Sequence, residues 1–297
     1  MRLIDVLKQD GLSNREARGL LITGKVSVDG FPTADPAREV DPRDVVVDPR
    51  APKVHPAEDL VVLRRDEHVA VVLKPPHFLS VHAPRRDDDD VIARMGRLYG
   101  GAWPVHRLDE QTSGLMMVAL SQRAQRGLKE RLAVHDVERG YLALVQGRFP
   151  LEAVEVDNHL VRDRGDGKRG SGEGEGARAA RTSLHGLEHL PGVSLVAAKL
   201  HTGRTHQVRI HLSELGYPIL GDALYGGQGV GRRASRLALH AARLAFDHPI
   251  TGEHWSFRTP LPDDLEQLRR RLESPPERAP ERPRRPKKNT PKKKKKK

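Results

Sequence analysis

The chain has 297 residues, 37% of them hydrophobic and 4% aromatic, which is enough for one substantial domain and a smaller one. It has no cysteine, which excludes disulfides and thiolate chemistry, and no run of about 18 apolar residues that would predict a transmembrane helix. The net charge of +12 is concentrated in residues 278–297, where twelve Lys and Arg accompany one Glu, so the rest sums to +1. A cytoplasmic protein with a polyanionic partner and no membrane contact is expected.

Residues 1–30 are typical of a compact helical unit closed by a turn. Apolar residues recur twice at helical spacing, and Ser13 with Glu16 forms a capping box between the two runs. Arg15 and Arg18 are three residues apart, so they share one helix face and can meet phosphates. A solvated face is the ordinary interpretation of such charges.

The segments RLIDVL and SNREARGLLITGKVSVDG resemble the S4 RNA-binding domain, whose two helices and following turn present basic residues to structured RNA. The resemblance covers roughly residues 1–50, departs from the family pattern at Asn14, and implies that Arg15 and Arg18 bind RNA. We expect three parts, which are an S4-like α/β module with its linker (1–57), a larger domain (58–273) and a disordered basic tail (274–297).

Short apolar runs alternate with helical patterns from about residue 60 to 272. The runs at 69–73, 115–120, 141–145 and 195–200 predict strands, and 122–133 and 206–215 predict helices. Because no regular βαβ rhythm is present, the pattern favours a mixed α+β architecture over a doubly wound sheet. Residues 162–178 are Gly-rich and charged without an apolar anchor, which predicts a mobile surface loop.

The segment VHRLDEQTSGLMMVAL places a polar cluster directly before an apolar strand. The cluster contains His106, Arg107, Asp109 and Thr112. If the segment is extended, Arg107 and Asp109 point to the same side, and an Arg–Asp ion pair in a loop is the ordinary interpretation. A tight turn ending at Gly114 would bring the backbone close to whatever occupies a cleft there.

The sequence HRLDEQTSGL resembles the HRLD-x-x-TSG signature of the RluA family of pseudouridine synthases. The sister RsuA family usually begins this motif with Gly, so His106 favours RluA. The resemblance implies a mixed β-sheet synthase domain, an isomerase that needs no cofactor or metal, an RNA substrate, and Asp109 as the catalytic carboxylate. HVAVVLKPPHFLSVHAP resembles a further block of the family, in which Lys74 faces RNA and His77 stands about where Gly is usual.

LHTGRTHQVRIHLSELGYPILGDALYG resembles the third block of the family almost residue for residue. By this resemblance, Arg209 forms an ion pair with the catalytic carboxylate, and Arg204, His206 and Gln207 help to shape the RNA-facing side. Tyr141, in VERGYLALV, occupies the position of the tyrosine that stacks on the target uracil and has been considered as a general base. From the residues alone, a core tyrosine is the default interpretation.

Two other classes of function fit parts of the sequence. A non-catalytic RNA-binding factor could keep the synthase fold, although retention of Asp109, Tyr141 and Arg209 argues against it. The sequence His185-Gly-Leu-Glu188-His189 fits a zinc-hydrolase pattern that requires a helix, which an internal Gly disfavours.

The S4-like module favours large-subunit ribosomal RNA as the substrate, with transfer RNA as the alternative. A monomer is the default expectation for the assembly. Arg107 or His106 is hypothesised to occupy the space that the extruded base vacates. The basic tail is expected to add non-specific phosphate contacts.

Overall fold

The computed structural model describes residues 1–22, 25–28, 31–32, 36, 39–48, 60–83, 89–226 and 234–273. The expected disordered tail, 274–297, lies outside the described residues. No helix within the described ranges is long and apolar enough to span a membrane.

The N-terminal segment folds around its own small core. Its elements are α1 (Leu3–Gln9), α2 (Asn14–Ile22), β1 (Val26–Val28), β2 (Phe31–Pro32), a 3-10 turn (Pro42–Asp44) and β3 (Val45–Val47). The three strands form an antiparallel sheet in the order β2-β1-β3. The predicted capping box is confirmed: the Ser13 amide donates to Glu16 Oε2 at 2.9 Å, and the Glu16 amide donates to Ser13 Oγ at 3.2 Å.

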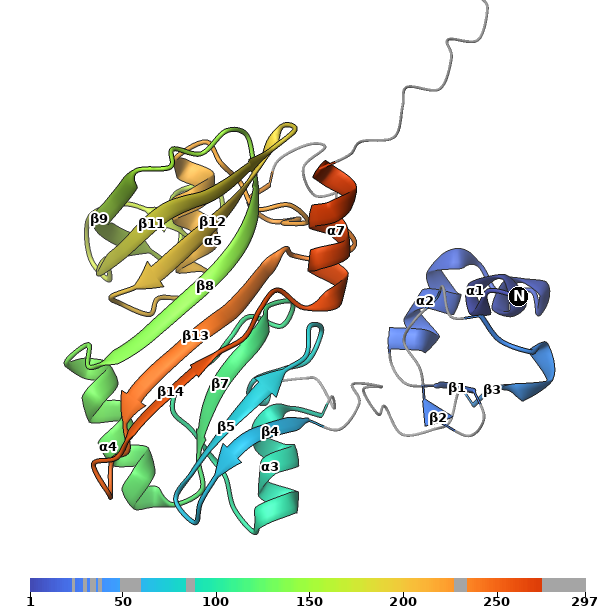
Figure 1. The fold of residues 1–297 in the computed structure, drawn as a ribbon, viewed down its shortest axis with the longest axis horizontal. Helices are drawn as coiled ribbons and strands as arrows, with labels where there is room; N and C mark the ends of the chain where they lie inside the picture. The colour runs from blue at the N-terminus through green and yellow to red at the C-terminus, as the bar shows by residue number, and fades with distance from the viewer. Residues whose placement is uncertain are drawn as a thin grey trace, which may run out of the picture.

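A mixed eleven-stranded sheet dominates the rest of the chain (Figure 1). Its strands are β4 (Val61–Arg65), β5 (Val69–Lys74), β6 (Trp103–Pro104), β7 (Ser113–Ala119), β8 (Val137–Gln146), β9 (Ala153–Val161), β10 (Gly170–Ser171), β11 (Arg178–Leu190), β12 (Val193–Leu200), β13 (Leu239–Asp247) and β14 (His254–Arg258). The main path is β10-β9-β11-β12-β8-β13-β7-β5-β4, with β14 beside β13 and β6 beside β7. Only the β13–β7 pairing is parallel among those described.

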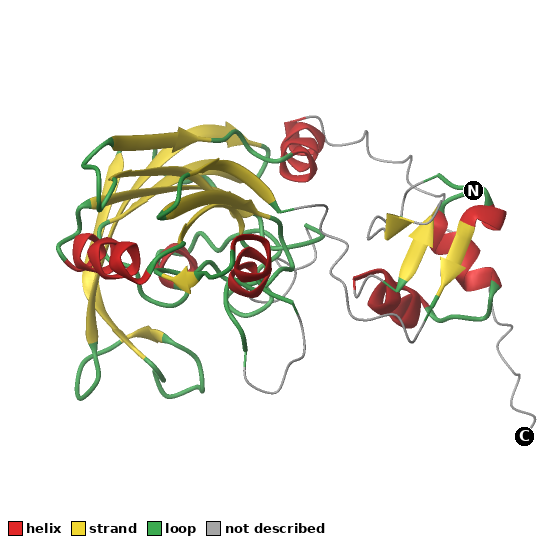
Figure 2. Cartoon of the chain, turned by 90° about the horizontal axis from the view of Figure 1, so that it is seen from below, coloured by secondary structure: helices red, strands yellow, loops and turns green. Residues whose placement is uncertain are grey.

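Within the described residues, four helices accompany this sheet: α3 (Val91–Tyr99), α4 (Gln122–Ala133), α5 (Gln207–Glu214) and α7 (Asp263–Glu273). Figure 2 shows the strands as a curved layer with helices lying against it. The predicted strands and helices and the mixed α+β architecture are confirmed.

Strands β5 and β7 are buried on both faces, which explains their continuous apolar sequences. Alternate side chains enter different cores: Val72 and Met116 join the core that includes β8, β12 and α5, whereas Val71 and Leu115 join the core that includes α4. Residues of both cores line the cavity described below.

The predicted surface loop and the zinc-like motif both lie in the region from β9 to β11. The segment 162–178 lies at the surface, as predicted, but it contains β10, which pairs with β9. The zinc-like motif lies in β11 and not on a helix: His189 Nε2 contacts the Phe149 carbonyl at 2.7 Å, and Glu188 forms an ion pair with Arg269 at 2.9 Å. Within the described ranges, no group of three His, Asp or Glu residues is arranged to hold a metal.

Candidate active site

A cavity of about 500 Å³ opens between β8, the loop before β7 and the start of α5. This volume lies in the range of ligand pockets, roughly 300–1,000 Å³. Its lining contains five cationic side chains and a single carboxylate: Arg107, Lys129, Arg139, Arg204, Arg209 and Asp109. A positive cleft on a body that is nearly neutral outside the tail favours an anionic ligand.

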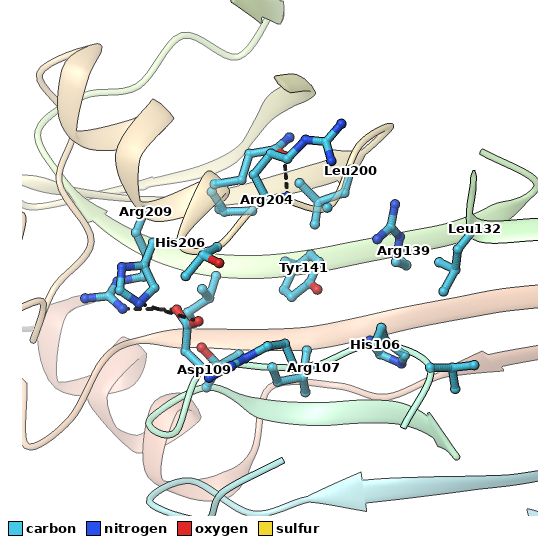
Figure 3. A pocket seen from close by; sticks show the side chains of 18 of the residues that line it. His106, Arg107, Asp109, Leu132, Arg139, Tyr141, Leu200, Arg204, His206 and Arg209 are labelled. Atoms are coloured by element: carbon cyan, nitrogen blue, oxygen red, sulfur yellow. Dashed lines mark hydrogen bonds and ion pairs between the residues drawn. The ribbon is translucent and has the colours of Figure 1, made fainter. Parts of the chain in front are cut away.

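The single carboxylate of the cavity, Asp109, is held by Arg209 (Figure 3). Arg209 also binds a second carboxylate, Asp222, which does not line the cavity. Arg209 Nη1 donates to Asp109 Oδ2 at 3.0 Å, while Nε and Nη2 donate to the two oxygens of Asp222 at 2.8 and 2.9 Å. His206 Nε2 lies 3.8 Å from the other oxygen of Asp109. The pKa of Arg209 is raised because these two carboxylates outweigh its burial, so the guanidinium keeps its charge.

Asp222 is the buried anchor of this arrangement. It also accepts hydrogen bonds from the amides of Leu224 and Tyr225 at 2.9 and 3.0 Å. Burial alone would raise the pKa of Asp222, but the hydrogen bonds and charge of Arg209 lower it below the ordinary value. Asp222 therefore fixes the position of the Arg209 guanidinium through Nε and Nη2, which leaves Nη1 to bind Asp109.

The loop that carries Asp109 is fastened at several points. Ser80 Oγ donates to the Leu108 carbonyl at 2.8 Å and accepts from the Leu108 amide at 3.0 Å. The Thr112 amide donates to the Asp109 carbonyl at 3.0 Å, which closes the turn. Lys74 Nζ donates to the Glu110 carbonyl at 3.0 Å. These bonds preorganise the carboxylate before any ligand binds.

Lys74 does not line the cavity, contrary to the sequence prediction that it contacts RNA. The side chain is fully buried, and its three donors go to the carbonyls of Pro75, Phe78 and Glu110 at 2.8, 2.8 and 3.0 Å. Burial lowers the pKa of Lys74 to about 7. Lys74 therefore ties the loop after β5 to the loop of Asp109.

The backbone at Gly114 approaches a different group from the one that the sequence predicted. Its φ is +121°, and a Cβ there would lie 2.3 Å from the Ala241 carbonyl oxygen of β13. The close approach predicted for this glycine is therefore to a neighbouring strand and not to a ligand. The ordinary alternative, an ion pair between Arg107 and Asp109, is not found; Asp109 pairs with Arg209, as the resemblance implied.

The segment before α5 is shaped by Gln207, which is only 2% exposed. Its Oε1 accepts from Thr202 Oγ1 and the Arg204 amide, and its Nε2 donates to the Arg181 carbonyl and Thr182 Oγ1. The amide uses all these bonds within the protein, so it positions the segment and does not itself present a free group.

His206 precedes α5 in a left-handed conformation, with φ +62°. Its Nδ1 lies 3.0 Å from the Tyr225 hydroxyl, and burial lowers the pKa of His206, with Asp109 opposing the shift. Arg204 Nε donates to the Ala179 carbonyl at 2.9 Å. Both side chains line the cavity.

Tyr141 lies on β8 and faces the cavity. It is 9% exposed, and burial raises its pKa to about 12, so the phenol is neutral at physiological pH. His106 also lines the cavity, where its Nε2 accepts from the Met117 amide at 3.0 Å. Burial lowers the pKa of His106 to about 3, so the ring is neutral and its proton resides on Nδ1.

The structure brings most of the predicted residues together. Asp109, Tyr141, Arg209, His106, Arg107, Thr112, Arg204, His206 and Gln207 all line the cavity. Arg107 is exposed, whereas Thr112 is buried with no hydrogen-bond partner for Oγ1 in the described part of the chain. Arg15 and Arg18 are exposed on α2.

The sequence did not single out Asp222 or Arg139 as site residues. Asp222 lies in the third block, but only its contact with Arg209 reveals its importance. Arg139 precedes Tyr141 by two residues, and strand alternation could have placed both on one face.

Comparisons with known proteins point to a single enzyme family. Residues 68–214 match the family described as RNA pseudouridylate synthase. The chain is 34% identical over 282 residues to ribosomal large subunit pseudouridine synthase D of Zymomonas mobilis, covering 86% of this chain and 88% of that protein. It is 37% identical over 204 residues to the dual-specificity RNA pseudouridine synthase RluA of Escherichia coli (strain K12), covering 68% and 93%.

Solved structures share the fold. Human RNA Pseudouridylate Synthase Domain Containing 1 superposes with a TM-score of 0.58 at 30% identity, covering 73% of this chain and 96% of that chain. Human RNA Pseudouridylate Synthase Domain Containing 4 has the same TM-score at 24% identity, covering 71% and 92%.

Proposed function

The chain belongs to the RluA-type RNA pseudouridine synthases, which are isomerases, and we propose that Asp109 is its catalytic carboxylate. The observation that carries the proposal is the placement of Asp109 beside Tyr141 in the cationic cavity, held by Arg209 at 3.0 Å. The reaction breaks the N1–C1′ bond of uridine and joins C5 to C1′. A carboxylate suits this change because it can act as a nucleophile or stabilise a developing sugar cation. Nothing is oxidised, reduced or added, so the chemistry requires no cofactor.

Tyr141 supplies the surface on which the uracil stacks. A pKa of about 12 leaves only about one phenol in 10⁵ ionised at pH 7, which argues against a phenolate base. Stacking on an aromatic ring contributes about 1–3 kcal/mol per base. Tyr141→Phe should therefore keep RNA affinity within about twofold, and Tyr141→Ala should weaken it by roughly 5- to 150-fold. Equal losses in the two variants, measured by fluorescence anisotropy, would contradict the stacking role.

The target base must leave its helix to enter the cavity, and Arg107 is suited to fill the space left behind. Its side chain is exposed at the cavity, whereas the ring of His106 is held by the Met117 amide. Of the two residues hypothesised for this role, Arg107 is therefore the better placed. Unchanged RNA binding and turnover in Arg107→Ala would refute it.

We further propose a substrate and a domain organisation. The substrate is large-subunit ribosomal RNA, with transfer RNA as the alternative, in view of the Zymomonas mobilis relative and the dual-specificity relative. Residues 1–57 form an S4-like RNA-binding module with Arg15 and Arg18 on its RNA face, 58–273 the catalytic domain, and 274–297 the basic tail. The first relative matches 86% of this chain, a larger share than 58–273 alone contains, which supports a module beyond the catalytic domain. A cytoplasmic monomer fits this role.

The test compares RNA from cells with the gene, without it, and with Asp109→Asn, by carbodiimide primer extension at single-nucleotide resolution. Glu110→Gln, one residue along the same loop, is the matched control and should behave as the wild type. We expect the same uridine or uridines to be unmodified in the deletion and in Asp109→Asn. Full modification by Asp109→Asn would overturn the assignment, and missing sites confined to transfer RNA would replace the proposed substrate.

A further inference from the structure

Arg139 is a buried cation in the wall of the cavity. It lies on β8 two residues before Tyr141, so both side chains project from the same face of the strand (Figure 3). Its register partners are Leu200 on β12 and Leu244 on β13, which are apolar. The residue is 8% exposed, so its guanidinium has little contact with bulk water.

No carboxylate pairs with this guanidinium within the described ranges. Its Nε is buried without a hydrogen-bond partner, and the neighbouring charge is a second cation, Arg204. Burial lowers the pKa of Arg139, Tyr141 opposes this shift, and Arg204 adds to it. Arg236, the other buried arginine of these ranges, is 4% exposed and forms an ion pair with Asp264 at 2.6 Å. Arg139 thus differs from its buried counterpart in lacking an anion.

The backbone makes room for the guanidinium. A Cβ at Gly203 would lie 2.4 Å from Arg139 Nη1, so the segment leading to α5 passes directly over the side chain. Gly203 and Arg139 both line the cavity. The guanidinium is therefore at the cavity surface and not sealed inside the apolar core.

Burying an unpaired charge costs several kcal/mol, so the position is explained most simply by an anion that arrives with the ligand. Arg presents a planar fork that matches phosphate oxygens, and every nucleotide of an RNA brings one phosphate. Two residues along a strand are about 7 Å apart, on the scale of one nucleotide, which separates a base on Tyr141 from a phosphate on Arg139.

We propose that Arg139 forms a phosphate subsite, in which its guanidinium binds the phosphodiester next to the uridine that occupies the cavity. The inference rests on the proposed function, because it takes RNA as the ligand. Arg139 completes a layout in which Tyr141 contacts the base, Asp109 the reacting centre and Arg139 the backbone.

The layout makes an unusual prediction for the free protein. If Arg139 serves only the ligand, Arg139→Met removes an unpaired buried charge, so its melting temperature should equal or exceed that of the wild type. Arg236→Met is the matched control: it leaves Asp264 without its partner and should melt at a lower temperature. A large loss of thermal stability in Arg139→Met would show a structural role and overturn the proposal.

Binding is measured with the full chain and a fluorescent oligouridylate, by anisotropy across a KCl series. For Arg139→Met we expect roughly 10- to 100-fold weaker binding, with a log–log salt slope shallower by about 0.7, the contribution of one phosphate on a single strand. Arg139→Lys should restore most of the slope and part of the affinity. Arg236→Met should keep the wild-type slope.

Each alternative has its own signature. Weaker binding with an unchanged slope would mean that Arg139 contacts a neutral base or sugar, and it would overturn the phosphate subsite. Unchanged affinity would do the same. Because anisotropy does not depend on turnover, failure of the proposed function would appear separately, as a wild-type enzyme that binds the oligonucleotide with the predicted slope but modifies no uridine.

Discussion

Asp222 and Asp109, the two carboxylates that pair with Arg209, should have different effects when each is changed to Asn. Asp222→Asn should mainly lower stability, and Asp109→Asn should mainly lower turnover. The side chain of Asp222 is 1% exposed and that of Asp109 is 18% exposed. Asp222→Asn turns an amide NH₂ towards a guanidinium or backbone donor and removes the buried countercharge. Losing one partner of a buried ion pair costs about 3–5 kcal/mol, which lowers the melting temperature by roughly 6–20 °C in a domain of this size.

Asp109→Asn should leave stability almost unchanged, because partly exposed ion pairs contribute about 0–1 kcal/mol and Asp222 still holds Arg209. Its turnover should fall by roughly 10³-fold or more. Asp222→Asn should lose about 10- to 100-fold in turnover, because Arg209 no longer positions Asp109.

The two variants are compared by differential scanning fluorimetry and by release of tritium from RNA labelled at uridine C5, since C5 loses its hydrogen when it joins C1′. Turnover is measured well below the melting temperature of Asp222→Asn. If Asp109→Asn loses as much stability as Asp222→Asn, or if Asp222→Asn is the less active of the two, the division between catalytic group and anchor is wrong.

Two further predictions rest on the structure, and a third rests on the charge of the tail sequence. Burial lowers the pKa of Lys74 from 10.5 to about 7, so the unfolded chain binds more protons between these values. Stability should therefore rise with pH across this window, by up to about 1.4 kcal/mol per unit, and urea titrations of Lys74→Met should lose this component. Gly114→Ala should lower the free energy of unfolding by about 3 kcal/mol through its contact with β13. Gly165→Ala, at φ +106° with open space around it, should lower it by about 1 kcal/mol. Equal losses of stability in the two variants would refute the steric argument. Truncation after Pro276 should flatten the salt dependence of RNA binding while turnover on saturating RNA stays intact, and an unchanged slope would assign the tail another role.

The local sequence was enough to predict most of the secondary structure around the cavity and the loop that contains Asp109. Period-two and helical patterns predicted strands at β5, β7, β8 and β12 and helices at α4 and α5. These predictions were possible because the spacing of apolar residues along the chain shows which faces of an element are buried. The motif around Asp109 predicted the reactive loop, and the family resemblance predicted its pairing with Arg209, 100 residues away.

Only the tertiary structure decided the partners of three other charged residues, Lys74, Asp222 and Arg139. The sequence suggests that Lys74 contacts RNA, yet its ammonium group donates to three backbone carbonyls, two in the loop after β5 and one in the loop of Asp109. Asp222 became the anchor of Arg209 only because the chain returns past α5, and Arg139 became an unpaired cation because apolar strands flank it. Periodicity records which face of an element is buried, but the identity of a buried charge's neighbours depends on long-range chain paths that no local pattern contains.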